Sequence, residues 1–89
     1  MDGNTVNEHW DAALPLLKEG DHAGADVHIN PIYHGLSSMT DYMLNKLDKN
    51  LKDVIVELEY DSAAWGLAGT LQREVKVEIG KRRINQRGQ

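Results

Sequence analysis

The sequence predicts an α+β fold, a small two-layer sandwich in which two helices cover one face of a sheet of two or three strands. The firmest observation is a pair of runs, residues 53–60 and 74–79, in which apolar and charged side chains alternate. A period of two is typical of strands that are buried on one side. Two stretches with helical spacing supply the covering layer, in the order α-β-α-β-β. The residues expected in the sheet core are Val54, Val56, Leu58, Val75, Val77 and Ile79.

The first helix is predicted over residues 6–19. Thr5 and Glu8 match a capping box, in which a hydroxyl and a carboxylate three residues apart satisfy free backbone N–H groups. Apolar residues then recur at helical spacing. Pro15 is expected to kink or shorten this helix because it lacks a backbone donor, and Gly20 is expected to end it.

A short extended segment is predicted at residues 26–30, where apolar and polar residues alternate. Pro31 follows directly, and because proline cannot donate a hydrogen bond to a neighbouring strand, it restricts the segment to a sheet edge. The following helix would then make a crossover connection, so that this strand and the next run parallel.

The second helix is expected to begin at a cap formed by Ser37 or Ser38 and to end near Lys52. Helical spacing of apolar residues also continues beyond Lys52, so a helix that reaches Tyr60 is the alternative. We favour a strand over residues 53–60, because this range begins with consecutive β-branched residues, which pack well on a pleated surface.

Residues 61–69 connect the two clear strands, either as a wide loop or as a single helical turn capped by Asp61 or Ser62. Residues 1–80 are expected to form one α+β domain. Residues 81–89 are expected to be a basic, disordered C-terminal tail.

Composition limits the classes of function. The chain has 89 residues, no cysteine and a net charge of −4, which excludes disulfides and thiolate chemistry. It has no apolar run of the roughly 20 residues that span a bilayer, and its start does not resemble a signal peptide. We therefore expect a cytoplasmic protein with no membrane contact. Residues 1–45 carry one base against seven acids, whereas residues 46–89 carry nine bases against seven acids.

No arrangement of residues indicates catalysis or a cofactor. The tightest group of candidate metal ligands is His22, Asp26 and His28, but its spacing matches no metal-site motif. Ser37, Ser38 and Ser62 lie outside the motifs that activate a serine nucleophile. We therefore expect no catalytic residues, no bound metal and no cofactor, and we predict that the protein is not an enzyme.

The charge asymmetry predicts a non-enzymatic binding protein, an adaptor or inhibitor of the kind that phages and mobile elements encode. It would self-associate and engage a basic protein surface through its acidic half. The candidate residues of this acidic face are Asp11, Glu19, Asp21 and Asp26.

Two alternative functions stay open. One is a nucleic-acid-binding module that contacts phosphates through Lys81, Arg82, Arg83 and Arg87, although the net negative charge of the chain opposes it. The other is a structural subunit of a homo-oligomer, joined through a strand edge or a surface formed by Trp10, Met39 and Met43. For these three residues we favour simple packing in the core.

Overall fold

The structure, a computed structural model, describes the backbone of residues 3–87 and the side chains of residues 6–85. Within these ranges the chain is helical and contains no strand. Its elements are α1 (Gly3–Lys18), α2 (His22–Gly35), the short 3₁₀ turn η1 (Leu36–Ser38), α3 (Asp41–Ile55) and α4 (Ala63–Arg87). The predicted α+β sandwich is therefore wrong, as are the strands expected at residues 26–30, 53–60 and 74–79.

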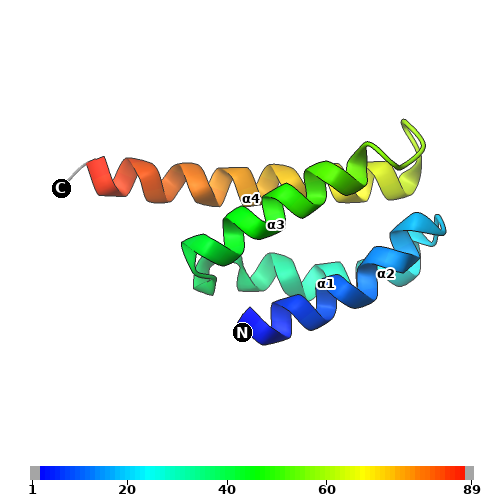
Figure 1. Ribbon diagram of the computed structural model, residues 1–89, viewed down its shortest axis with the longest axis horizontal. Coiled ribbons are helices and arrows are strands. Elements are labelled where there is room, and N and C mark those ends of the chain that lie inside the picture. The colour runs from blue at the N-terminus through cyan, green and yellow to red at the C-terminus, as the bar shows by residue number, and fades with distance from the viewer. Residues whose placement is uncertain (1–2, 88–89) are drawn as a thin grey trace.

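The helices form two antiparallel hairpins, α1 with α2 and α3 with α4 (Figure 1). Helix α2 also packs against α4, and α1 makes lighter contacts with both α4 and α3. Since one groove lies between α1 and α3 and another between α2 and α4, the order around the bundle is α1-α2-α4-α3. The Cα atoms span 44 × 25 × 16 Å. Because the helices run lengthwise, the connections 19–21 and 56–62 lie at the same end of the molecule, which we call the loop end.

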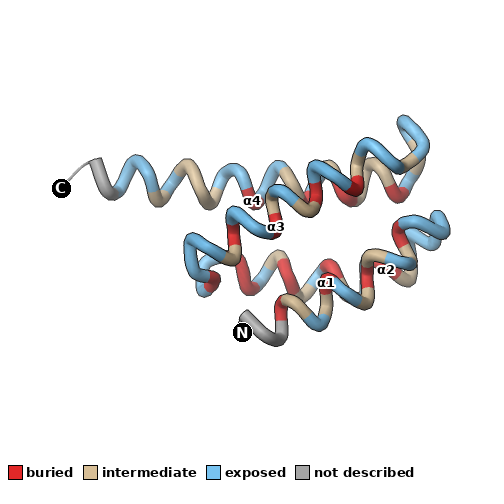
Figure 2. The backbone as a smooth tube through the Cα atoms, viewed as in Figure 1, coloured by how far each residue is buried: buried red, intermediate tan, exposed pale blue. Residues whose placement is uncertain are grey.

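One apolar core runs between the helices, because each helix places apolar residues three or four positions apart on its inner face (Figure 2). Trp10 and Met39 are 5% and 4% exposed, which confirms that they pack in the core and leaves no Trp10/Met39/Met43 surface to join copies. Helix α1 contributes Val6, Trp10, Ala13 and Leu17, and α4 contributes Ala64, Ala68, Leu71 and Val75.

Helix α4 replaces the strand predicted at residues 74–79. Val75 is fully buried, whereas Val77 is 44% exposed, so the two residues face different sides. In a strand they would share a face, but in a helix residues two apart diverge and those three or four apart align. The helical pattern was missed because much of the buried face of α4 consists of Ala64 and Ala68, small residues that carry little weight in a hydrophobic pattern.

Helix α3 continues past Lys52 and ends at Ile55, short of Tyr60. It is capped by Thr40, whose Oγ1 accepts a hydrogen bond from the N–H of Met43 at 3.2 Å. Ser37 and Ser38, the predicted caps, lie in η1 instead. The expected strand over residues 53–60 is thus divided between the last turn of a helix and an irregular loop.

The first predicted helix is confirmed as α1, with slightly different ends. It begins at Gly3, so Thr5 lies within the helix and not at its N-cap. It also runs through Pro15 to Lys18. The expected segment at residues 26–30 lies within α2, which likewise contains Pro31.

Candidate protein-interaction site

The four acidic residues singled out from the sequence are exposed but do not form one face. Asp11 lines a groove between α1 and α3, and Asp26 lines a groove between α2 and α4. In the order α1-α2-α4-α3 these grooves lie on opposite sides of the bundle. Glu19 and Asp21 occupy the turn at the loop end. Of the four predicted acidic residues, the structure therefore brings together only Glu19 and Asp21.

A tight turn positions Glu19 and Asp21. Gly20 ends α1 with a φ of +80°, a left-handed conformation that glycine adopts without steric cost. The N–H of Gly20 donates to the carbonyl of Leu17 at 3.0 Å, and the N–H of Asp21 donates to Leu16 at 2.9 Å. These two bonds satisfy the carbonyls of Leu16 and Leu17 in the last turn of α1, and Gly20 ends the helix as predicted.

Asp21 also begins the next helix. Its Oδ1 accepts a hydrogen bond from the N–H of Gly24 at 3.0 Å, so it is the N-cap of α2. A carboxylate at this position also complements the positive end of the helix dipole. Asp21 therefore has a structural role, and Glu19 is the freer of the two acids for contact with a partner.

The loop of residues 56–62 forms the other half of the loop end. The N–H groups of Glu57 and Leu58 donate to carbonyls in the last turn of α3, at 3.0 and 3.2 Å. Asp61 has a φ of +64°, and this left-handed residue redirects the chain. Ser62 then caps α4, because its Oγ accepts a hydrogen bond from the N–H of Trp65 at 3.1 Å. This confirms Ser62 as a helix cap, although the helix has 25 residues and not a single turn.

A shallow groove of about 210 Å³ lies between the turn and the loop, and we call it the loop-end groove. Leu17, Leu58 and Ala64 supply its apolar side chains, and Glu19, Glu57 and Glu59 supply carboxylates. Lys18 pairs with Glu57 at 3.5 Å. Both side chains are at least half exposed, so water and salt weaken this pair. The remaining lining residues are Lys18, Gly20 and Ser62.

The loop end is strongly acidic. Residues 18–22 and 56–62 together contain one lysine against five acids. The five acids are Glu19, Asp21, Glu57, Glu59 and Asp61. Three of them belong to the second half of the chain and were missed, because the strand prediction placed Glu57 and Glu59 on the outer face of a sheet. The signal available in the sequence was three acids within five residues, followed by a serine able to cap a helix.

Exposed apolar groups accompany these carboxylates. Val56 and Tyr60 are each 80% exposed. The Tyr60 ring lies against Trp65 with 4.8 Å between centroids and an interplanar angle of 55°. Lysine and arginine side chains have apolar stems and cationic heads, and they also bind the faces of aromatic rings. The loop end therefore offers both kinds of contact that a basic side chain uses.

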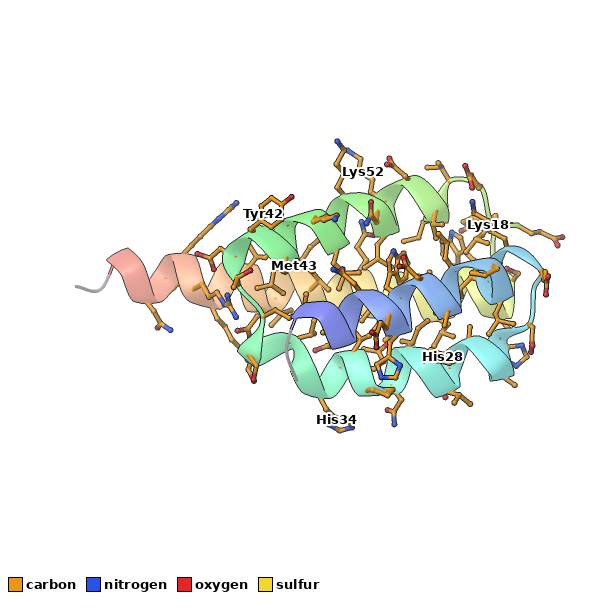
Figure 3. The ribbon with its side chains drawn as sticks, turned by 60° about the horizontal axis from the view of Figure 1, so that its bottom comes forward. Lys18, His28, His34, Tyr42, Met43 and Lys52 are labelled. Carbon is orange, nitrogen blue, oxygen red and sulfur yellow. The ribbon has the colours of Figure 1, made fainter. Side chains whose placement is uncertain are left out.

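The remaining candidate ligands do not gather into a metal site. Within the described residues, no group of three or more histidine, aspartate or glutamate side chains is close enough to hold a metal ion. His28 instead lies beside His9 of α1, with ring centroids 5.8 Å apart. In Figure 3 His34 lies near the end of α2 that is opposite to the loop end, whereas His28 lies near the middle of the helix.

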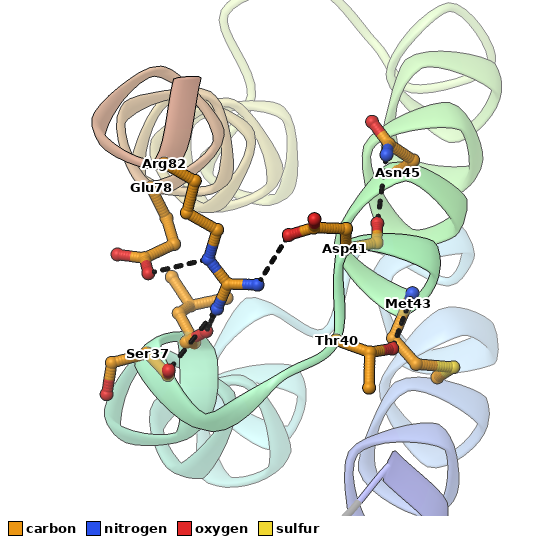
Figure 4. A network of polar contacts seen from close by, with 8 residues as sticks. Ser37, Thr40, Asp41, Met43, Asn45, Glu78 and Arg82 are labelled. Carbon is orange, nitrogen blue, oxygen red and sulfur yellow. Dashed lines mark hydrogen bonds and ion pairs between the residues drawn. The ribbon is translucent and has the colours of Figure 1, made fainter. Parts of the chain in front are cut away.

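The predicted basic tail continues α4, which is helical as far as Arg87. Arg82 donates to the Asp41 carboxylate at 2.8 Å and to Glu78 at 3.1 Å. It also donates to the carbonyls of Leu36 and Ser37, at 3.3 and 3.2 Å (Figure 4). Its guanidinium thus joins α4 to η1 and the start of α3, and the Asp41 hydrogen bond raises its pKa further above the usual value.

The other basic residues of this segment differ from Arg82. Lys81 and Arg83 are exposed, and the Arg87 side chain lies outside the described ones. Nucleic-acid binding through these residues stays a prediction. The structure already commits Arg82 to two carboxylates and two carbonyls, which leaves its guanidinium less available to phosphate.

Comparison of the chain with protein-family models, curated proteins and solved structures gave no match. No helix in the described part of the chain is both long and apolar enough to cross a bilayer. Interpretation of the loop end therefore depends on its own chemistry.

Proposed function

We propose that this protein is a small non-enzymatic binding protein that engages a basic surface of another macromolecule through its loop end. The observation that carries the proposal is the gathering of five acids from both halves of the chain beside the exposed side chains of Val56 and Tyr60. Clustered charge of one sign speeds encounter with an oppositely charged partner, and exposed apolar groups then supply area for contact.

The charge and apolar contributions should be separable. Carboxylates at the rim of an interface chiefly affect the rate of association and its dependence on salt. Tyr60 and Val56 would bury apolar surface whose contribution varies little with salt. Binding through the loop end should therefore weaken at high ionic strength without disappearing.

A fluorescent oligolysine peptide tests the charge contribution. Its anisotropy would be measured with the protein at about 10 mM and about 300 mM salt, between which the screening length falls from roughly 30 Å to less than 8 Å. The variant Glu19→Lys/Glu59→Lys should bind about tenfold more weakly at low salt, which corresponds to about 1.4 kcal/mol. The matched control is Glu8→Lys/Asp11→Lys, which makes the same change of net charge at exposed sites of α1.

The control variant should lose clearly less affinity than the loop-end variant. Equal losses would mean that net charge alone determines binding and would overturn the assignment of the site. Binding that is equally tight at both salt concentrations would contradict the electrostatic basis of the proposal.

A pair of tyrosine variants tests the apolar contribution. Tyr60 and Tyr42 are both largely exposed, at 80% and 73%, but Tyr42 lies in the first turn of α3, away from the loop end. Tyr60→Ala should weaken peptide binding while Tyr42→Ala leaves it unchanged. Since Trp65 touches Tyr60 and Trp10 is buried, a change in tryptophan fluorescence on binding should disappear in Trp65→Phe.

A further inference from the structure

The C-terminal turns of α4 project beyond the rest of the bundle. Arg82 pairs with Asp41, the first residue of α3, so residues 83–87 extend past the point at which α3 begins. At 1.5 Å per residue these five residues add about 7 Å. Figure 1 shows this end of α4 standing clear of the other helices, opposite to the loop end.

The projecting end carries an apolar side chain among bases. Ile84 is 71% exposed, and Lys81 and Arg83 beside it are exposed as well. None of these three side chains takes part in the hydrogen-bonded network of Arg82. The surface is thus cationic and apolar, whereas the loop end is anionic and apolar.

We propose that the loop end binds the C-terminal turns of α4 from a second copy of this chain. This inference depends on the proposed function and names the basic partner of the same site. Lys81 and Arg83 would meet the carboxylates of Glu19 and Glu59, and Ile84 would lie against the exposed Val56 and Tyr60. The two surfaces carry opposite charge and both expose apolar side chains. This complementarity is the basis for choosing a second copy as the occupant.

The two surfaces lie at opposite ends of a molecule whose longest extent is 44 Å. A contact between them joins different patches of the two copies, so it leaves one loop end and one helix end free for further copies. Association should therefore continue beyond a dimer as the concentration rises. The contact is small, and small interfaces are weak and transient, so association should be weak and strongly dependent on salt.

Sedimentation velocity at low and high salt tests the proposal with a charge exchange. One variant, Glu19→Lys/Glu59→Lys, changes the net charge of the loop end from −4 to 0 and leaves the C-terminal end basic. The other, Lys81→Glu/Arg83→Glu, changes the net charge of residues 81–87 from +4 to 0 and leaves the loop end acidic. The wild-type protein should associate at low salt, and each variant alone should remain monomeric. An equimolar mixture of the two should associate again, because the intact basic end of the first variant can contact the intact acidic loop end of the second.

Matched controls keep the net charge equal while leaving both ends intact. They are Glu8→Lys/Asp11→Lys for the first variant and Lys49→Glu/Lys52→Glu for the second, all at exposed positions. Both controls should still associate. Circular dichroism of each variant would establish that the helices are retained.

Carbodiimide cross-linking of the wild-type protein gives an independent measurement that needs no variant. It joins amines to carboxylates in contact, so it should link Lys81 of one copy to Glu19 or Glu59 of another, with mass spectrometry of isotope-mixed copies identifying the link. Links between copies that omit this pair would overturn the proposal.

A wild-type protein that is monomeric at low salt would overturn self-association, as would a mixture of the two variants that fails to associate. If the loop end still binds oligolysine in either case, the proposed function stands and only the identity of the partner is wrong. If the protein neither self-associates nor binds oligolysine through the loop end, both the identity of the partner and the proposed function are wrong.

Discussion

The glycines within α4 should lower the stability of the folded protein. Gly66, Gly69 and Gly80 lie within the helix, and a Cβ atom added at any of them meets no atom within 4 Å apart from the adjacent residues and the backbone of the helix itself. Glycine in a helix interior is about 0.8–1 kcal/mol less favourable than alanine, because it loses more backbone entropy on folding. Alanine at each site should therefore stabilise the protein by about 0.5–1 kcal/mol, and Gly66→Ala with Gly80→Ala by about 1–2 kcal/mol, since the two sites are far apart.

The same substitution at the loop end should have the opposite sign. Gly20 has a φ of +80°, where alanine is strained by about 1–2 kcal/mol. A Cβ atom at Gly24 would collide with Oδ2 of Asp21, the side chain that caps α2. Its displacement would weaken the cap, which is typically worth about 1 kcal/mol. Alanine should therefore stabilise the protein at Gly66, Gly69 and Gly80 and destabilise it at Gly20 and Gly24.

Urea denaturation, monitored by circular dichroism, measures the free energy of unfolding of both groups of glycine variants. An unchanged slope of this free energy against urea concentration would show that only stability has changed. For a domain of this size, 1 kcal/mol corresponds to a shift in Tm of about 4–8 °C. Neutral or destabilising effects of alanine at all three α4 sites would refute the placement of residues 63–87 in one helix with an open outer face.

Three further outcomes follow from particular contacts. Arg82→Ala should destabilise the protein by about 1–2 kcal/mol in urea denaturation, a figure discounted for partial exposure. Arg82→Lys should restore less than half of the lost stability, because an ammonium group cannot reach the same acceptors as the planar guanidinium. Full restoration of stability would refute the four-acceptor network. Val75→Ala should lower the free energy of unfolding by about 1–2 kcal/mol and Val77→Ala by less than about 0.5 kcal/mol, since only Val75 is fully buried. Equal effects of the two substitutions would favour a strand. Burial, with the charges of Asp26 and Glu74, raises the pKa of Tyr33 above 10.0, so its contribution to stability is present below pH 10 and is lost as the pH rises through this raised pKa. Absorbance titration of tyrosinate should show a component with a pKa above 10.0 that is missing in Tyr33→Phe, and the same substitution should remove part of the loss of stability at alkaline pH. A titration curve whose high-pH component survives in Tyr33→Phe would contradict this.

The parts of the fold that the sequence predicted correctly have strong local causes. Helix α1 combines a regular apolar stripe with a glycine that ends it. Trp10 and Met39 are large apolar residues, so their burial was expected. The acidity of the turn was also evident, because Glu19 and Asp21 flank the glycine that reverses the chain.

The parts that were wrong depend on long-range packing. Val75 and Ile79 are four residues apart and Val77 lies between them, a pattern compatible with either a strand or a helix. The choice is made by the buried neighbours Ala64 and Ala68, which are small enough to let α4 approach the other helices closely. Their importance emerges only when the whole helix is placed against α2 and α3. The groove between the turn and the loop likewise joins segments almost 40 residues apart, which no local pattern could reveal.

The residues that suggested a strand also explain why the loop end has a surface suited to binding. The β-branched residues Val54, Ile55 and Val56 are poor helix formers as a group, and α3 ends within them. Leu58 turns partly toward the core and holds the loop against the bundle, whereas Val56 and Tyr60 are left exposed. Neither exposed side chain is needed to bury the core, because the helices already cover it. Apolar side chains that remain in water beside carboxylates contribute little to the stability of the monomer. Their contribution to free energy becomes available only when a basic, partly apolar partner covers them.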